Sequence, residues 1–267
     1  MVPRAVLAEI SFMTLFSTLR QWARLGGDLL WPPRCVFCGA EPGDGELRRR
    51  VEVCDGCARA ITAGGPRCGG CGQPGDANPC GRCGGRLGRC AGIVVLGGYA
   101  DALRDAVLRA KRPTGDMLTA GLAALIVEQH RDRLEGWGID LVVPVPMHWR
   151  RRAARGTSAA DELARGVAAG LGLPRRRLLR RSRPTVMQNE LPREERRGNV
   201  AGAFRAGGWL GGWPGGGIAD RRILLVDDVT TTGATLAACS DALLSAGAAS
   251  VYAAVAARAD ATDTTHT

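Results

Sequence analysis

A pair of carboxylates follows an apolar run near the end of the chain and precedes a segment rich in threonine and glycine. The run is Ile223 to Val226, and Asp227 and Asp228 come next. Such carboxylates accept hydrogen bonds from vicinal sugar hydroxyls or hold Mg²⁺ near a pyrophosphate. Free N–H groups at the start of a helix bind phosphate. We therefore predict catalytic roles for the aspartates and phosphate binding by Val229, Thr230, Thr231, Thr232, Gly233, Ala234 and Thr235.

A second anion site is expected after another apolar run, Ile139 to Val145. The segment from Met147 to Arg197 contains 14 arginines and five acidic residues, a balance of +9 in a chain whose net charge is +10. Clustered positive charge of this kind is typical of a site for pyrophosphate or nucleic acid, although a solvated basic face would look the same. The loop residues expected to bind the anion are Arg150, Arg151, Arg152, Arg155 and Gly156.

Lys111 is the only lysine among the 36 basic residues. Coding bias explains the excess of arginine, but a compact ammonium can be required where a planar guanidinium would not serve. A polar, proline-interrupted segment from Leu178 to Phe204 has no clear periodicity, and it is typical of a hood that closes over a substrate or of plain surface. We expect substrate contacts from Lys111, Gln188, Arg196 and Asn199.

Nine of the ten cysteines lie between Cys35 and Cys90. Eight of them form four C-x-x-C pairs, and two such pairs complete a tetrahedral zinc site. Disulfides would need an oxidising compartment, a thioredoxin-like motif would need a βαβ core, and iron–sulfur runs are spaced differently. Two structural zinc ions are therefore predicted, with sequential and interleaved pairing both open and Cys90 left out; the ligands are Cys35, Cys38, Cys54, Cys57, Cys68, Cys71, Cys80 and Cys83.

The composition is that of an ordinary globular chain, with 267 residues of which 45% are hydrophobic. No run reaches the ~18 apolar residues of a membrane span. The first 30 residues do not resemble a signal peptide, and translation starting at Met13 instead of Met1 stays open. We expect a cytoplasmic protein. The sequence does not indicate an oligomeric state.

Apolar runs alternate with helical periodicity after the cysteines, which predicts an α/β fold with a parallel sheet. Strands are expected at Ile93 to Tyr99, Ile139 to Val145, Ile223 to Val226 and Val251 to Ala256, and helices between them. The predicted organisation is a lead-in over 1–30, a double zinc ribbon over 31–90, an α/β domain over 91–260 and a tail over 261–267.

Taken together, these features resemble the ComF/GntX family of competence-associated proteins. The stretch Ile223 to Thr235 resembles the phosphoribosyl-pyrophosphate (PRPP) motif of type I phosphoribosyltransferases, and the four C-x-x-C pairs and Pro144-Val145-Pro146 also match. One departure concerns Arg155-Gly156, which is followed by Thr157, Ser158 and Ala159 where relatives usually have an aromatic residue, Asn and Gln. The resemblance implies a type I phosphoribosyltransferase-like sheet with helices on both faces, Mg²⁺-PRPP as ligand, and competence-machinery proteins as partners.

Two hypotheses follow. The first is a phosphoribosyltransferase that transfers the sugar from PRPP to an unidentified acceptor, in DNA uptake or nucleotide metabolism. The second is a non-catalytic module that binds single-stranded DNA through the zinc ribbons and the arginine-rich face. The family likeness does not decide between them, because a fold does not establish an activity.

Overall fold

The computed structural model describes residues 34–41, 53–75, 80–81, 83–84, 87–147, 158–182, 202–207 and 217–259. The chain forms two units, residues 1–54 and 55–267. In the first unit the described residues include a turn in which the Gly39 N–H donates to the Cys35 carbonyl at 2.7 Å. The predicted lead-in, the domain boundary at residue 90 and the tail stay predictions.

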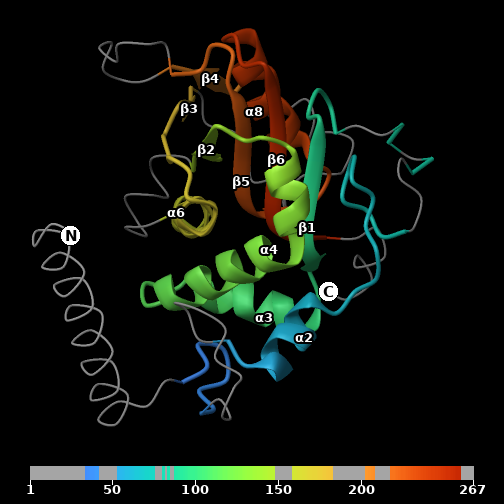
Figure 1. Cartoon of the computed structure of the whole chain (residues 1–267), viewed down its shortest axis with the longest axis vertical. Coiled ribbons are helices and arrows are strands. Elements are labelled where there is room, and N and C mark those ends of the chain that lie inside the picture. Colours follow the sequence, from blue (N-terminus) through green and yellow to red (C-terminus); the bar gives the residue numbers. More distant parts are fainter. Residues whose placement is uncertain are drawn as a thin grey trace, which may run out of the picture. The chain divides into compact units, whose positions relative to one another are not determined.

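A four-stranded parallel sheet forms the centre of the second unit (Figure 1). Its strands are β1 (Gly92–Gly98), β6 (Ser250–Arg258), β5 (Arg222–Thr230) and β2 (Leu141–Pro144), in that spatial order. The apolar run Ile223 to Val226 is completely buried because β5 lies between β6 and β2 and is covered on both faces. Continuous burial explains why this strand shows no polar alternation.

Helices α3 (Asp101–Ala110), α4 (Asp116–Gly136) and α6 (Ala159–Leu171) lie on one face of the sheet (Figure 1). Helix α4 packs against α6, β1 and β6, whereas α6 covers β5 and β2. Helix α2 (Asp55–Thr62) packs against α3 and β1. These helices together form one of the two layers that cover the sheet.

The opposite face is covered by α8 (Ala234–Ser245) and by the antiparallel pair β3 (Leu179–Arg181) and β4 (Phe204–Ala206). Its core joins Ile223 and Leu225 of β5 to Leu236 and Leu243 of α8. The cysteine-rich segment contributes four residues to the same core, namely Cys68, Cys71, Leu87 and Cys90. The predicted α/β class, with a parallel sheet covered by helices and a cysteine-rich region before it, is confirmed.

Several boundaries differ from the prediction. The strand expected to end at Val226 continues to Thr230, because Asp227, Val229 and Thr230 still pair with β6. The segment expected to lack regular structure begins and ends in the β3–β4 pair. Helix α4 runs to Gly136 with His130 in a non-helical conformation, and α2 was not predicted. None of the helices described is long and apolar enough to cross a membrane.

Candidate functional site

The two aspartates lie at the carboxyl end of β5, the edge of the sheet where open α/β folds bind ligands. The Asp228 N–H donates to Asp227 Oδ1 at 3.0 Å, and the Val229 N–H donates to Asp228 Oδ1 at 2.9 Å. Burial raises the pKa of Asp227 well above its usual range, and the charge of Asp228 adds to this effect. The charged form of the Asp227 carboxyl is therefore disfavoured in the folded protein.

Lys111 contacts this pair directly. Its Nζ lies 3.0 Å from Asp228 Oδ2, and the two side chains are 30% and 25% exposed. Lys111 ends α3, and the chain turns there because the Gly115 N–H donates to the Arg112 carbonyl at 2.9 Å. The single lysine of the chain is thus placed at the predicted sugar site, 117 positions before its partner in sequence.

The predicted phosphate-binding segment divides into a strand end and a turn. Val229 and Thr230 belong to β5, and Thr231 to Gly233 form the turn before α8. Gly233 is the N-cap of α8, has a φ of +78° and offers no side chain to cap the helix. The Oγ1 of Thr231 is buried without a hydrogen-bond partner among the described residues. The Ala234 N–H at the start of α8 donates to Thr232 Oγ1 at 3.3 Å, and a helix start beside the unsatisfied Thr231 hydroxyl can bind a phosphate.

A hollow of about 20 Å³ adjoins Lys111 and Asp228. It is also lined by Asp116 and Thr119 of α4, by Met147, and by Ala159 and Glu162 of α6. Three further groups that the sequence analysis did not single out, Asp116, Thr119 and Glu162, therefore border the site. Their sequence positions gave no signal, because nothing in the pattern showed that the first turns of α4 and α6 meet at β5.

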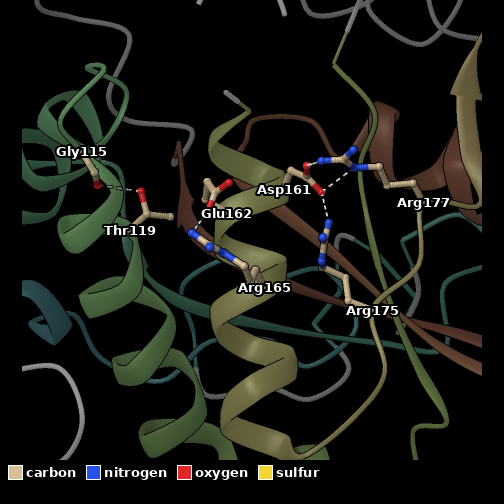
Figure 2. Close-up of polar contacts among 7 residues, drawn as sticks. All are labelled: Gly115, Thr119, Asp161, Glu162, Arg165, Arg175 and Arg177. Atoms are coloured by element: carbon tan, nitrogen blue, oxygen red, sulfur yellow. Dashed lines mark hydrogen bonds and ion pairs between the residues drawn. The ribbon is translucent and has the colours of Figure 1, made fainter. Parts of the chain in front are cut away.

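Asp161 anchors the arginines that follow α6, as Figure 2 shows. It is buried and pairs with Arg175 and Arg177; the Arg177 Nε donates to Asp161 Oδ1 at 3.1 Å. Arg165 pairs with Glu162 on the same helix. The hydrogen bond from Arg177 to Asp161 raises the pKa of that guanidinium. Two acids of α6 thus offset two of the three positive charges that these arginines carry.

The other predicted substrate contacts lie outside the described residues. These are the anion loop (Arg150, Arg151, Arg152, Arg155 and Gly156) and the hood residues Gln188, Arg196 and Asn199. The described ends of the anion loop, Met147 and Ser158, both border a hollow of about 60 Å³ lined by Arg177. The roles of these eight residues stay predictions.

The eight predicted zinc ligands form two clusters, each made of consecutive C-x-x-C pairs. Within each cluster the four Sγ atoms all lie within 4.8 Å of one another; the clusters are Cys35, Cys38, Cys54 and Cys57, and Cys68, Cys71, Cys80 and Cys83. The pairing is therefore sequential. Cys90 lies apart from both clusters, fully buried, with its thiol donating to the Gly92 carbonyl at 3.3 Å.

The cluster geometry fits zinc. Tetrahedral Zn–S bonds of ~2.3 Å place the sulfur atoms about 3.8 Å apart. The Sγ atoms of Cys38 and Cys54 are 3.8 Å apart, and those of Cys71 and Cys80 are 3.6 Å apart. A backbone N–H also donates to sulfur at 3.4 Å in both clusters, from Cys54 and from Cys80.

Charge supports the same conclusion. Burial, the strongest influence on Cys68, would raise its pKa, but hydrogen bonds headed by the Cys80 N–H lower it to about 6. Burial and the neighbouring thiols raise the pKa of Cys71 to about 12. Four thiols this close cannot all lose their protons unless a cation lies between them. The clusters are consistent with two structural zinc ions.

Leu87 is a site residue that the sequence analysis missed. A Cβ built on Gly233 would lie 2.3 Å from Leu87 Cδ1, so the leucine packs directly on the backbone of the phosphate-binding turn. The available signal was weak: Leu87 is an isolated apolar residue four positions after the last C-x-x-C pair. Nothing in the spacing indicated what it would cover.

Family models match two parts of the chain. Residues 27–87 match a double zinc ribbon domain, and residues 115–265 match a phosphoribosyl transferase domain. The second match includes Asp227, Asp228 and the turn before α8. Lys111 falls between the two matched regions.

Curated relatives cover most of the chain. It is 30% identical to Competence protein F of Haemophilus influenzae over 210 residues, which is 76% of this chain and 87% of that protein. It is 31% identical over 205 residues to the DNA utilization protein YhgH of Salmonella typhi, covering 74% and 87% of the two chains. The corresponding protein of Escherichia coli K12 is 30% identical over the same length and shares.

Proposed function

This chain belongs to the ComF/GntX family, whose members join a double zinc ribbon to a phosphoribosyltransferase domain, and we propose that it binds Mg²⁺-PRPP at the β5–α8 junction. One observation carries the proposal. The Asp227–Asp228 pair, with Lys111 at 3.0 Å from Asp228, lies directly before a turn that ends in the N-cap glycine Gly233 and starts helix α8.

Each part of PRPP has a chemical counterpart in this arrangement. The 5-phosphate binds the N–H groups and hydroxyls of Thr231 to Thr235, and the ribose hydroxyls bind Asp227 and Asp228. The pyrophosphate carries Mg²⁺ and binds the arginines after Met147, which remain the predicted anion loop. When bound, Mg²⁺ would supply charge neutralisation on the pyrophosphate, and Asp227 and Asp228 are the carboxylates that we propose to assist it.

We further propose that the chain is a phosphoribosyltransferase. The bond between ribose C1 and pyrophosphate breaks, a bond from C1 to a nucleophilic atom of the acceptor forms, and pyrophosphate leaves with the bonding electrons. Positive charge develops on the ribose in the transition state, and the carboxylates of β5 stabilise it. The acceptor of the phosphoribosyl group is not identified. A release assay for pyrophosphate, run over candidate bases and nucleic-acid ends, tests transfer separately from binding.

Lys111 has a defined place in this proposal. In the free protein its ammonium compensates the charge of Asp228, and in the complex the pyrophosphate offers it a stronger anionic partner. A lysine suits an exchange between two anions better than an arginine, because its charge is compact and its stem flexible. The absence of any other lysine in an arginine-rich chain agrees with this role.

The relatives' names support a role in DNA handling. Competence protein F and DNA utilization protein YhgH are named for the uptake or use of DNA. We propose a role of the same kind for this chain, with competence-machinery proteins as partners. A DNA-linked acceptor would join this role to the PRPP site.

Calorimetric titration with Mg²⁺-PRPP tests the binding proposal. The wild type should give a saturable heat at submillimolar ligand, and the variant with both Asp227→Asn and Asp228→Asn should give none. Asp241→Asn is the matched control, since it removes an exposed carboxylate from α8. A wild type that gives no heat at millimolar ligand would contradict the proposal.

The single-stranded DNA module stays the second candidate. It loses support from the pairing of Arg165, Arg175 and Arg177 with acids of α6, because these acids offset two of the three positive charges. Titration with a labelled oligonucleotide at two salt concentrations distinguishes the candidates. Binding that weakens steeply with salt and ignores Asp227→Asn would favour the DNA module.

A further inference from the structure

We propose that Leu87 is a positioning residue that connects the second cysteine cluster to the phosphate-binding turn, so that zinc binding and PRPP binding strengthen each other. The inference rests on the proposed function, since PRPP is the ligand of that turn. It adds a coupling between two sites, and it assigns a role to a residue in neither of them.

The contact between Leu87 and the turn is close. Leu87 is 8% exposed. A Cβ on Gly233 would lie 2.3 Å from its Cδ1 and 2.8 Å from its Cδ2. The next residue, Gly88, also approaches α8, because a Cβ there would lie 2.8 Å from the Cβ of Ala237. The chain that leaves the cysteine cluster therefore lies on the turn and on the first turn of α8.

The same segment is held at its other end by the sheet. The Ala91 N–H donates to the Val251 carbonyl of β6 at 2.8 Å, and the Cys90 N–H donates to the Leu87 carbonyl at 3.1 Å. The Ile93 N–H of β1 donates to the Gly69 carbonyl at 2.8 Å, and Gly69 lies between the ligands Cys68 and Cys71. The cysteine cluster, the edge of the sheet and the turn are thus joined by one short stretch of chain.

Zinc binding fixes this stretch because its four ligands must converge. Cys83, the last of them, precedes Leu87 by four residues. Metal binding orders ligand segments that have no such order when the thiols are protonated. Loss of the metal therefore releases Cys83, four residues before Leu87, and weakens the support that Leu87 gives to Gly233.

Support of Gly233 bears directly on phosphate binding. The N–H groups of the turn bind an anion well only when they already point toward it, because ordering them at the moment of binding lowers affinity. Gly233 has a φ of +78°, a conformation that a glycine can leave easily. The side chain of Leu87 holds it there. Any effect of zinc on PRPP affinity must then be matched by an equal effect of PRPP on zinc affinity.

Leu87→Ala tests the contact. In the zinc-loaded full chain this variant should bind Mg²⁺-PRPP about tenfold more weakly by calorimetry. Leu87→Met fills the same space and should stay within about twofold of the wild type. Leu108→Ala removes the same atoms from a leucine of α3 that is 42% exposed, and it should change nothing. A folded Leu87→Ala protein with wild-type affinity would overturn the inference while leaving the proposed function intact.

Zinc affinity gives a second measurement that does not depend on the stability of any Leu87 variant. A chromogenic chelator competes for zinc from the wild type, with and without saturating Mg²⁺-PRPP. PRPP should tighten one of the two zinc sites by about tenfold, and the variant with Asp227→Asn and Asp228→Asn should lose this effect. Zinc affinities that ignore PRPP, in a wild type that binds PRPP, would overturn the inference. A wild type that binds no PRPP would overturn both proposals.

Discussion

The two cysteine clusters have the same ligands but different surroundings. In both, two C-x-x-C pairs bring four thiols within 4.8 Å of one another, and a backbone N–H donates to sulfur at 3.4 Å. Cys68 and Cys71 are buried and belong to the core beneath β1, β5 and β6. In the first cluster Cys35 is buried and Cys38 is exposed, and among the described residues neither belongs to that core.

The difference shows how one metal chemistry serves two structural purposes. A closed Cys₄ site orders its own short segments wherever it lies. In the second cluster these segments also cover the sheet and reach the phosphate-binding turn through Leu87. Loss of the first cluster should therefore disturb its own segments and α2, which carries Cys57, whereas loss of the second should also disturb the core of the sheet and the turn. The following changes test this contrast, in order of decreasing effect on the unfolding of the α/β unit.

Removal of the second site should have the largest effect. The variant with Cys68→Ser and Cys71→Ser should lose one zinc ion and about 5 kcal/mol or more of stability, since a structural zinc contributes folding free energy directly. Zinc analysis and thermal unfolding measure the two losses. Mg²⁺-PRPP should bind about tenfold more weakly to the folded variant, as the reciprocal coupling requires. A variant that keeps the melting temperature of the wild type would contradict the integration of this cluster with the core.

Gly233→Ala should disrupt the contact between Leu87 and Gly233 by changing its second residue. The new Cβ meets Leu87, and a φ of +78° is strained for alanine, so we expect about 2 kcal/mol of destabilisation in denaturant unfolding. PRPP affinity should fall as well. Combination with Leu87→Ala removes the clash, so the two losses should sum to more than the double variant shows. Strict additivity would argue against direct contact.

Asp227→Asn leaves both clusters intact and changes only the charge at the end of β5. Below about pH 4 the Asp227 carboxyl is protonated in both states and contributes nothing. As pH rises, the folded protein keeps the proton longer than the unfolded chain, because its pKa is raised, so stability falls until the pH passes that pKa. The Asp227→Asn variant has no carboxyl at this position, so its stability does not fall in this way as pH rises.

We therefore expect Asp227→Asn to be more stable than the wild type by about 1 kcal/mol on the alkaline side, and equal to it in acid. Unfolding curves across pH measure the difference. The same variant should bind PRPP poorly and retain two zinc ions. A stability difference that grows toward acid would contradict the assigned shift.

Removal of the first site should have the smallest effect on the α/β unit. The variant with Cys35→Ser and Cys38→Ser should lose one zinc ion, keep its PRPP affinity within about twofold and change the main unfolding transition by less than ~1 kcal/mol. Calorimetry and thermal unfolding supply both numbers. Loss of PRPP binding in this variant would remove the contrast between the clusters.

Much of this architecture could be predicted from local patterns. The run Ile223 to Val226 indicated a doubly covered strand, and the carboxylates after it had to lie at the ligand-binding edge. The C-x-x-C pairs indicated two metal sites, because ligand type and spacing are local properties. These predictions needed only the chemistry of neighbouring residues.

The remainder depends on contacts between distant segments. Spacing alone left sequential and interleaved pairing equal, and only the folded chain distinguishes them. The contact of Leu87 with Gly233, like that of Lys111 with Asp228, joins positions more than 100 residues apart. The predicted end of the strand was too early, because Asp227 and Val229 also take part in β pairing. A charged residue such as Asp227 does not indicate that a strand continues. Gln188, Arg196 and Asn199, outside the described residues, stay predictions.

The strand order β1-β6-β5-β2 has a consequence for the biosynthesis of the protein. The last strand, Ser250–Arg258, lies between the first strand and β5, so β1 has no sheet neighbour until the C-terminal part of the chain has been synthesised. Both cysteine clusters, by contrast, are complete once residue 83 has emerged from the ribosome. Zinc can therefore fold the cysteine-rich segments long before the sheet exists. The second cluster is then a preformed surface on which β5 and β6, the last strands to be synthesised, can assemble.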